Sequence, residues 1–247
     1  MKKQVSVFGL HARAVLHRLL SAALGLLAVE LILTGVCMIR GTAITLAGSD
    51  LEHALQYPFR AGILVLQVLL ASCFGSNSRY GYTLRRLRVS ERCVFLWSCA
   101  CKALCYAVLW CVQIMASVGA AFWNASSARY SAGPQGVFVD FYRSGFLHGL
   151  FPLADGYVWT RNALFVLALG CVTAYMQLGM RRKGSRSWLV CMGLTLLLVL
   201  CLPVQYGAGR STGIFHAIAA LLVGLAFLGF GLTQTHSGKD GLADEVD

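Results

Sequence analysis

Long apolar stretches separated by short polar segments constrain this chain more than any other feature of its sequence. A helix of roughly 20 mostly apolar residues crosses the hydrocarbon core of a bilayer. The sequence offers six such stretches, at residues 19–39, 58–75, 93–123, 162–180, 188–206 and 213–232. The second begins at Pro58, a residue that the first turn of a helix accepts. We therefore expect an all-α integral membrane protein with six transmembrane helices.

The composition leaves no room for a separate soluble domain. Of the 247 residues, 57% are hydrophobic and 13% are charged, and so few charges cannot cover the surface of a soluble domain of this length. We expect a single transmembrane domain over residues 1–235. Residues 236–247 are polar and acidic without periodicity, which is typical of a disordered tail.

The basic residues are distributed unequally between the two sides of the predicted bundle. The side of the N-terminus carries Lys2, Lys3, Arg13, Arg18, Arg79, Arg85, Arg86, Arg88, Arg92, Lys102, Arg181, Arg182, Lys183, Arg186 and Lys239. The other side carries Arg40, Arg60, Arg129, Arg143, Arg161 and Arg210. Because basic residues accumulate in cytoplasmic loops, this asymmetry predicts cytoplasmic termini, an even number of spans and a multi-pass protein of the plasma membrane. It also accounts for the net charge of +11 without a nucleic-acid partner.

The segment before the first apolar stretch has the pattern of an amphipathic helix. Its apolar residues recur at helical spacing, at Phe8, Ala12, Val15, Leu16 and Leu19. The opposite face carries His11, Arg13 and Arg18. This pattern predicts a helix in the cytoplasmic interface, and a short solvated leader is the alternative. The apolar stretch that follows is too long for the core of a signal peptide, so we expect it to be retained as the first span.

Ten cysteines would indicate a disulfide scaffold in a small secreted protein. Here seven of them fall within apolar stretches, and Cys93, Cys99 and Cys101 lie at the predicted cytoplasmic end of the third stretch. Cys101 and Cys105 share a helical face, but no CxxC pair and no histidine at ligand spacing accompanies them. We expect reduced thiols, no metal site and no cofactor.

Residues 75–92, GSNSRYGYTLRRLRVSER, are the most informative segment of the chain. Thr83 can cap a short helix, and Ser90 followed by Glu91 favours the start of the third span, with the acid at the positive end of the helix dipole. The segment therefore predicts a short, basic and partly apolar helix between the second and third spans. Binding of its arginines to anionic membrane lipid is the alternative interpretation.

Residues 82–92, YTLRRLRVSER, resemble the loop between the second and third helices of bacterial ABC-2 type transporter permeases. In that family a threonine, a leucine and a proline-valine-serine stretch lead into the third helix, and Arg88 stands here where proline is usual. The six-span layout and the cytoplasmic termini extend the likeness over nearly the whole chain. The resemblance implies a coupling helix that contacts a separate ATPase subunit through Tyr82, Thr83, Leu84, Arg85, Arg86, Leu87, Arg88 and Glu91.

The function implied by this resemblance is that of a permease subunit, an exporter that works as a homodimer or as a heterodimer with a second permease. No GxxxxGK[ST] motif occurs in the sequence, so the ATPase activity is expected on a partner subunit and this chain is not expected to be an enzyme. A non-transporting membrane protein, such as an immunity or sensor-type partner, is the alternative. A membrane enzyme is less favoured, because no paired acids and no nucleophile–base set converge at one depth.

Glu30 lies in the middle of the first predicted span. A carboxylate at that depth costs about 2.5 to 3.5 kcal/mol on insertion scales, so the side chain must face protein or water, or be protonated. It is therefore a candidate for a substrate path. A protonated acid that is hydrogen-bonded to a neighbouring helix explains the residue equally well.

Residues 121–161 form the only long outer loop, and aromatic residues are dense in it. Because aromatic side chains collect at membrane interfaces, this loop predicts helices along the outer leaflet. A substrate gate is the alternative.

The second half of the last predicted span carries glycines at Gly224, Gly229 and Gly231. Glycine lets two membrane helices approach closely, because no side chain separates their backbones. We expect this span to pack against its neighbours through these positions.

Overall fold

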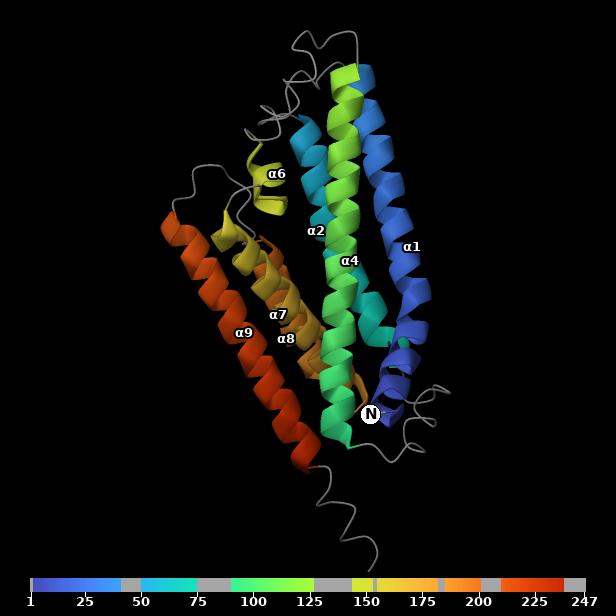
Figure 1. Cartoon of the computed structure of the whole chain (residues 1–247), viewed down its shortest axis with the longest axis vertical. Helices are drawn as coiled ribbons and strands as arrows, with labels where there is room; N and C mark the ends of the chain where they lie inside the picture. The colour runs from blue at the N-terminus through green and yellow to red at the C-terminus, as the bar shows by residue number, and fades with distance from the viewer. Residues whose placement is uncertain are drawn as a thin grey trace, which may run out of the picture.

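The computed structural model describes residues 2–40, 50–74, 90–126, 144–152, 155–181, 185–200 and 210–237. Its elements are α1 (Lys2–Arg40), α2 (Asp50–Ala71), the 3-10 helix η1 (Ser72–Phe74), α4 (Glu91–Ser126), α6 (Gly145–Leu150), α7 (Gly156–Arg181), α8 (Ser185–Leu200) and α9 (Arg210–Ser237) (Figure 1). Within these ranges there is no strand. The all-α fold is confirmed.

Five of the described helices are long and apolar enough to cross a membrane. Their apolar spans are Ala12–Arg40, Asp50–Ala71, Glu91–Asn124, Gly156–Met180 and Gly213–Thr235. Helix α8 corresponds to the fifth predicted span, but its apolar part, Trp188–Leu200, is shorter than the roughly 20 residues that a full crossing needs. The chain is a multi-pass helical membrane protein with five full-length spans and one shorter apolar helix in its described part.

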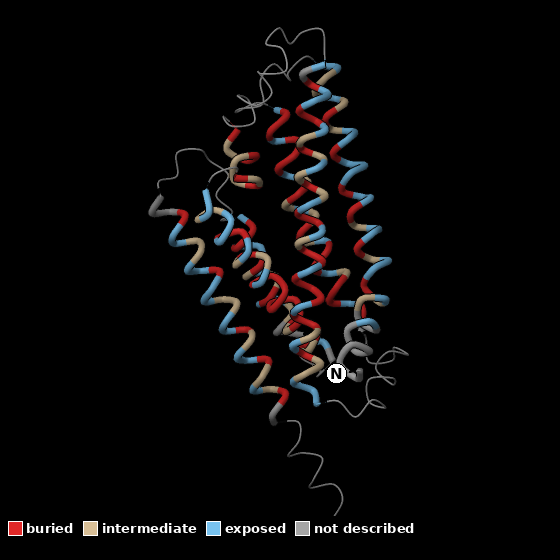
Figure 2. The backbone as a smooth tube through the Cα atoms, in the orientation of Figure 1, coloured by how far each residue is buried: buried red, intermediate tan, exposed pale blue. Residues whose placement is uncertain are grey.

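The surface of the bundle is apolar and its interior contains polar groups. Leu24, Met115 and Phe215 are 65%, 74% and 78% exposed, which suits contact with lipid tails. Polar side chains, among them Gln67 and Thr195, are fully buried between helices. Figure 2 shows buried residues concentrated along α2, α4 and α7, and long exposed faces on α1 and α9.

Helix α7 lies at the centre of the helix contacts. It packs against α4, α8 and α9 and also touches α2. On the other side, α1 packs against α2 and α4. The bundle therefore consists of an α1, α2 and α4 group and an α7, α8 and α9 group (Figure 1), joined mainly where α4 meets α7.

Small residues bring the helices together at two crossings. A Cβ atom built on Gly170 of α7 would lie 2.9 Å from the Ala103 nitrogen and 2.9 Å from the Cys99 carbonyl oxygen of α4, so these two backbones are in direct contact. A Cβ on Gly224 of α9 would lie 3.4 Å from the Ala168 Cα.

The glycines of α9 differ in what they face. Gly224 packs on α7, and a Cβ on Gly231 would overlap the Phe95 ring of α4. The packing role predicted for these two glycines is confirmed. At Gly229 a Cβ would meet nothing within 4 Å among the described residues, so that part of the chain makes no close approach there.

The second span begins earlier than the sequence predicts. Helix α2 starts at Asp50 and contains Pro58 in its interior, whereas the prediction placed Pro58 in the first turn. Proline is tolerated inside membrane helices because neighbouring groups satisfy the freed backbone carbonyl. The correction adds Glu52 and Gln56 to the helix, and both are buried.

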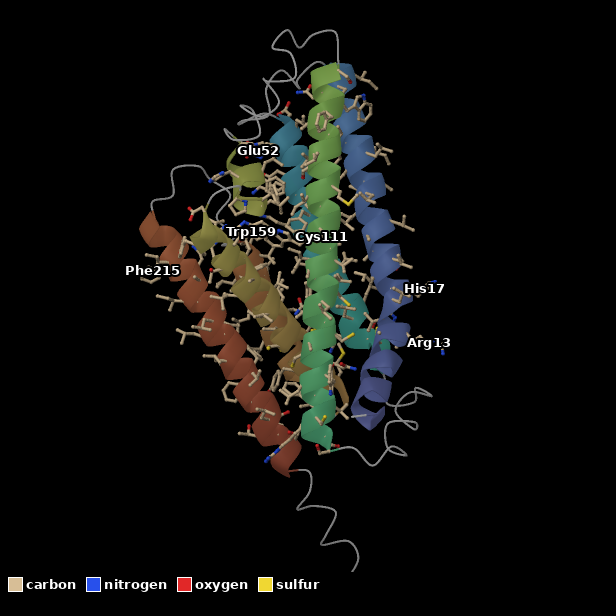
Figure 3. The ribbon with its side chains drawn as sticks, in the orientation of Figure 1. Arg13, His17, Glu52, Cys111, Trp159 and Phe215 are labelled. Atoms are coloured by element: carbon tan, nitrogen blue, oxygen red, sulfur yellow. The ribbon has the colours of Figure 1, made fainter. Side chains whose placement is uncertain are left out.

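The helix expected before the first span is present and is continuous with that span. Helix α1 extends without interruption over 39 residues. Val15 and Leu19 of the predicted apolar face are buried in the core, whereas Leu16 is exposed. Arg13 and His17 are exposed and project away from the bundle (Figure 3).

Both ends of the described chain lie at the same end of the bundle. Helix α1 begins and α9 ends at the lower end in Figure 1, where η1 ends and α4 begins. This arrangement agrees with an even number of crossings; the cytoplasmic side remains a prediction from the charges. Helix α9 extends through Ser237, two residues into the predicted tail, and residues 238–247 lie outside the described residues.

Candidate functional site

Most of the predicted ATPase-coupling segment lies outside the described residues, including Tyr82, Thr83, Leu84, Arg85, Arg86, Leu87 and Arg88. Of that set the structure describes Glu91, which is exposed and is the first residue of α4. The backbone nitrogen of Val94 donates to the Ser90 oxygen at 3.2 Å. The helix start predicted from Ser90 and Glu91 is thus confirmed, and the coupling role stays a prediction.

The chain that enters this segment is bound to helix α1 by Arg18. Nη1 of Arg18 donates to the Leu69 carbonyl oxygen at 2.7 Å and to the Ser72 hydroxyl at 2.6 Å. A cationic side chain satisfies the carbonyl groups that a helix C-terminus leaves without amide partners. The Cys73 thiol adds a weak contact to the Ala14 oxygen at 3.9 Å. The last turn of α2 is therefore tied to α1 directly before the predicted coupling segment.

Lys102 is a buried charge inside the bundle. The charge count places it with the basic residues of the cytoplasmic side, but it lies in the fourth turn of α4 and is 1% exposed, so it is not a loop residue. Its ammonium donates to the Thr173 carbonyl oxygen at 3.1 Å and to the side-chain oxygen of Gln177. Both acceptors are on α7.

Two further hydrogen bonds extend the Lys102 cluster between α4 and α7. Ser98 donates to the Gln177 oxygen at 3.2 Å, and the hydroxyl groups of Tyr106 and Thr173 are 2.9 Å apart. All these side chains are buried. Amide and hydroxyl groups thus solvate the Lys102 charge within the membrane-spanning part of the bundle, in the way that polar groups in membrane interiors pair with each other or with carbonyls.

Glu30 faces α4 from the middle of α1. It is 3% exposed, and its carboxyl interacts with the side chain of Gln113. The geometry gives neither carboxyl oxygen a hydrogen bond from a described residue, and the side-chain oxygen of Gln113 also has none. The Gln113 nitrogen makes only long contacts, 3.5 Å to the Leu55 oxygen and 3.4 Å to the Ser117 hydroxyl. The structure therefore places Glu30 at a closed helix–helix contact.

A second buried glutamate holds the short helix α6 at the end of the bundle away from the N-terminus (Figure 1). Glu52 of α2 is 8% exposed. Its Oε1 accepts hydrogen bonds from the Ser144 hydroxyl at 3.1 Å and from the Phe146 backbone nitrogen at 2.8 Å. Ser144 in turn caps α6 by accepting from the Leu147 nitrogen at 3.3 Å. Figure 3 shows Glu52 beside α6, with Trp159 at the start of α7.

Helices α4 and α7 hold the other end of α6. Nε1 of Trp110 donates to the Leu150 oxygen at 3.0 Å, and Nδ2 of Asn162 donates to the Gly149 oxygen at 2.8 Å. Apolar packing accompanies these bonds, since the Phe59 ring lies 5.3 Å from the Trp110 ring and 6.2 Å from the Phe146 ring. Each of the helices α2, α4 and α7 thus contributes a polar contact to α6.

The position of α6 corrects the prediction for the long outer loop. The aromatic residues of 121–161 predicted helices along the outer leaflet, but Phe146, Leu147 and Leu150 are buried in the core. The physical reason is a set of hydrogen bonds that satisfy backbone groups of α6 away from water: Glu52 accepts one from the first turn of that helix, and Trp110 and Asn162 each donate one to its carbonyl oxygens. Residues 127–143 lie outside the described residues.

The cysteines in the described ranges are free thiols. Among the described residues no group of three or more histidine, cysteine or acidic side chains has a geometry that could hold a metal ion. Cys101 and Cys105 do share a face of α4 and interact with each other, as their spacing predicts. No described residue set therefore suggests a metal centre.

The sequence prediction missed three residues that organise the interior: Glu52, Lys102 and Gln113. A second span that starts at Pro58 leaves Glu52 outside the helix, and the charge distribution groups Lys102 with the loop residues. A signal was available in the spacing of polar residues along α4. Ser98, Lys102, Tyr106, Gln113, Ser117 and Asn124 recur at helical intervals, and all are buried, so a polar stripe faced protein in an otherwise apolar span.

Comparison of the chain with protein-family models, curated proteins and solved structures gives no match.

Proposed function

We propose that this chain is the permease subunit of an ABC-type transporter, an exporter driven by a separate ATPase subunit, in the plasma membrane. It works as a homodimer or as a heterodimer with a second permease. The resemblance of residues 82–92 to the coupling loop of ABC-2 permeases motivates the proposal. The observation that carries it is how the helices at the two ends of this loop are held.

The helix that leads into the loop is bound to α1. The last turn of α2 is attached to α1 through the Arg18 hydrogen bonds to Leu69 and Ser72. A displacement of residues 75–89 by a partner would therefore act on α1 and α2 together. Coupled motion of this kind is how small shifts at one site become movements of whole helices.

The other end of the loop continues into a single long helix. Helix α4 has 36 residues, about 54 Å at 1.5 Å per residue, and it reaches from the loop to the opposite end of the bundle. About a third of the way along α4, Ala103 contacts Gly170 of α7, and just past its midpoint Trp110 binds Leu150 of α6. A push on the start of α4 would reach both α7 and the buried helix α6.

Glu30 has a place in this proposal as a residue of the substrate path. In the described conformation it is enclosed between α1 and α4. It would line a path only when these two helices separate. The substrate itself is not identified by the residues around it.

The first test is whether the reading frame adjacent to this one encodes an ATPase with a P-loop, and the second is whether that ATPase co-purifies with this chain. The double variant R85E/R86E is expected to abolish the complex and its ATP hydrolysis in proteoliposomes. The matched control, R182E/K183E, changes the same number of charges in the segment between α7 and α8 and should leave the complex intact. Retention of the complex by R85E/R86E would contradict the proposal and would favour a non-transporting protein whose basic loop binds anionic lipid.

A further inference from the structure

The contact between Glu30 and Gln113 contains buried polar atoms that lack hydrogen-bond partners in the part of the chain that the structure describes. The two side chains interact, and three of their oxygen atoms, the two of the Glu30 carboxyl and the one of the Gln113 amide, have no hydrogen-bond partner at hydrogen-bonding geometry among the described residues. Glu30 is 3% exposed and Gln113 is fully buried. Such an arrangement of acceptors is unfavourable in a membrane interior, because each buried acceptor needs a donor.

An ionised glutamate cannot resolve this shortage, since a carboxylate only accepts hydrogen bonds. A protonated carboxyl has one O–H donor. That donor would serve the Gln113 oxygen and would remove the charge at the same time. A neutral carboxylic acid is therefore the state of Glu30 that matches the groups around it.

The charged residues of the packed helices do not face Glu30. On α1 the nearest are Arg18, which binds Leu69 and Ser72, and the exposed Arg40. On α4, Lys102 is about 16 Å along the helix axis from Gln113 and donates to α7. On α2, Arg60 interacts with Tyr57. The carboxyl itself interacts with Gln113.

A metal cation would fit the same oxygens less well. Hard cations take about six or more oxygen ligands in proteins, and this contact offers three. We propose that Glu30 and Gln113 form a buried one-proton site between α1 and α4, in which Glu30 holds the proton and donates to the Gln113 amide oxygen. The site does not depend on the proposed transport function.

The proton on Glu30 can be observed directly by infrared spectroscopy. In the full-length protein in lipid nanodiscs at neutral pH, we expect the carbonyl stretch of a protonated carboxylic acid. Substitution of Glu30 by glutamine, E30Q, should remove this band. The matched control is E52Q, at the other buried glutamate, whose Oε1 accepts two hydrogen bonds, and this control should leave the Glu30 band unchanged.

Two further variants keep the test decisive if E30Q does not fold. E30D should shift the band, and Q113L should move it to higher frequency because the hydrogen bond to the amide is lost. Absence of the band in the wild-type protein at neutral pH would overturn the proposal. Stabilisation of the wild type, but not of E30Q, by sodium chloride relative to choline chloride would also overturn it and would indicate a metal-cation site.

Discussion

The two buried glutamates of this bundle, Glu52 and Glu30, occupy opposite environments. Glu52 lies at the end of the bundle near α6, where the Ser144 hydroxyl and the Phe146 amide donate to it. Glu30 lies between α1 and α4, where no described residue donates to it. Both are nearly inaccessible. Burial alone therefore does not define the role of an acidic residue in a membrane helix, because the hydrogen-bond donors around it decide which protonation state is stable.

The difference separates a structural glutamate from a chemically active one. The donors at Glu52 attach α6 to α2. Glu30 has no such donors among the described residues, and the neutral form proposed for it needs none. Substitutions that remove charge but preserve shape should distinguish the two residues.

The largest effect is expected from E52A. This variant removes the acceptor of two buried hydrogen bonds and leaves the Ser144 hydroxyl and the Phe146 amide without it, which should lower the free energy of unfolding by about 3 kcal/mol. Thermal unfolding in detergent measures this loss. E52Q keeps one acceptor oxygen and should lose less. An E52A variant as stable as the wild type would contradict the clamping of α6 by Glu52.

An intermediate effect is expected from W110F at the other end of α6. Phenylalanine keeps the ring contacts with Phe59 and Phe165 but removes the hydrogen bond to the Leu150 oxygen. We expect a loss of about 1 kcal/mol in the same unfolding assay. The control is W123F, at a tryptophan that is 45% exposed, which should change stability by less than about 0.5 kcal/mol. Equal effects of the two variants would argue against this anchor.

The smallest effect is expected from E30Q. Glutamine has the shape of a neutral glutamic acid and retains a donor for the Gln113 oxygen, so the free energy of unfolding should stay within about 0.5 kcal/mol of the wild type. A loss as large as that of E52A would mean that Glu30 is ionised and bound by a cation, and the contrast between the two glutamates would then be wrong.

Sequence patterns alone indicate the helical, membrane-spanning character of this protein, and they place the spans Glu91–Asn124 and Gly213–Thr235 to within a few residues at both ends. The spans Ala12–Arg40 and Gly156–Met180 begin earlier than predicted, because polar residues interrupt their first turns. The start of α2 is missed because Pro58 was expected in a first turn, whereas membrane helices accept proline internally. The burial of α6 could not be predicted, because its aromatic residues suit an interface equally well and its true position depends on Glu52 from a distant part of the chain.

The candidate sites were predictable to different degrees. Glu30 stands out in an apolar stretch, but its partner Gln113 becomes visible only when α1 and α4 are paired in space. The Arg18 contact with α2 depends in the same way on tertiary packing. The coupling segment rests on its sequence resemblance, because residues 75–89 lie outside the described residues.

The central claim is that the segment between η1 and α4 contacts an ATPase subunit. Site-specific photo-crosslinking tests it most directly, with a photoreactive amino acid placed at Leu84 and, as a control, at Lys183. The account predicts that the adjacent reading frame encodes a P-loop ATPase, with an ATP-responsive crosslink to it from position 84 and none from position 183. Crosslinks from position 84 to lipid alone, with the ATPase present, would contradict it.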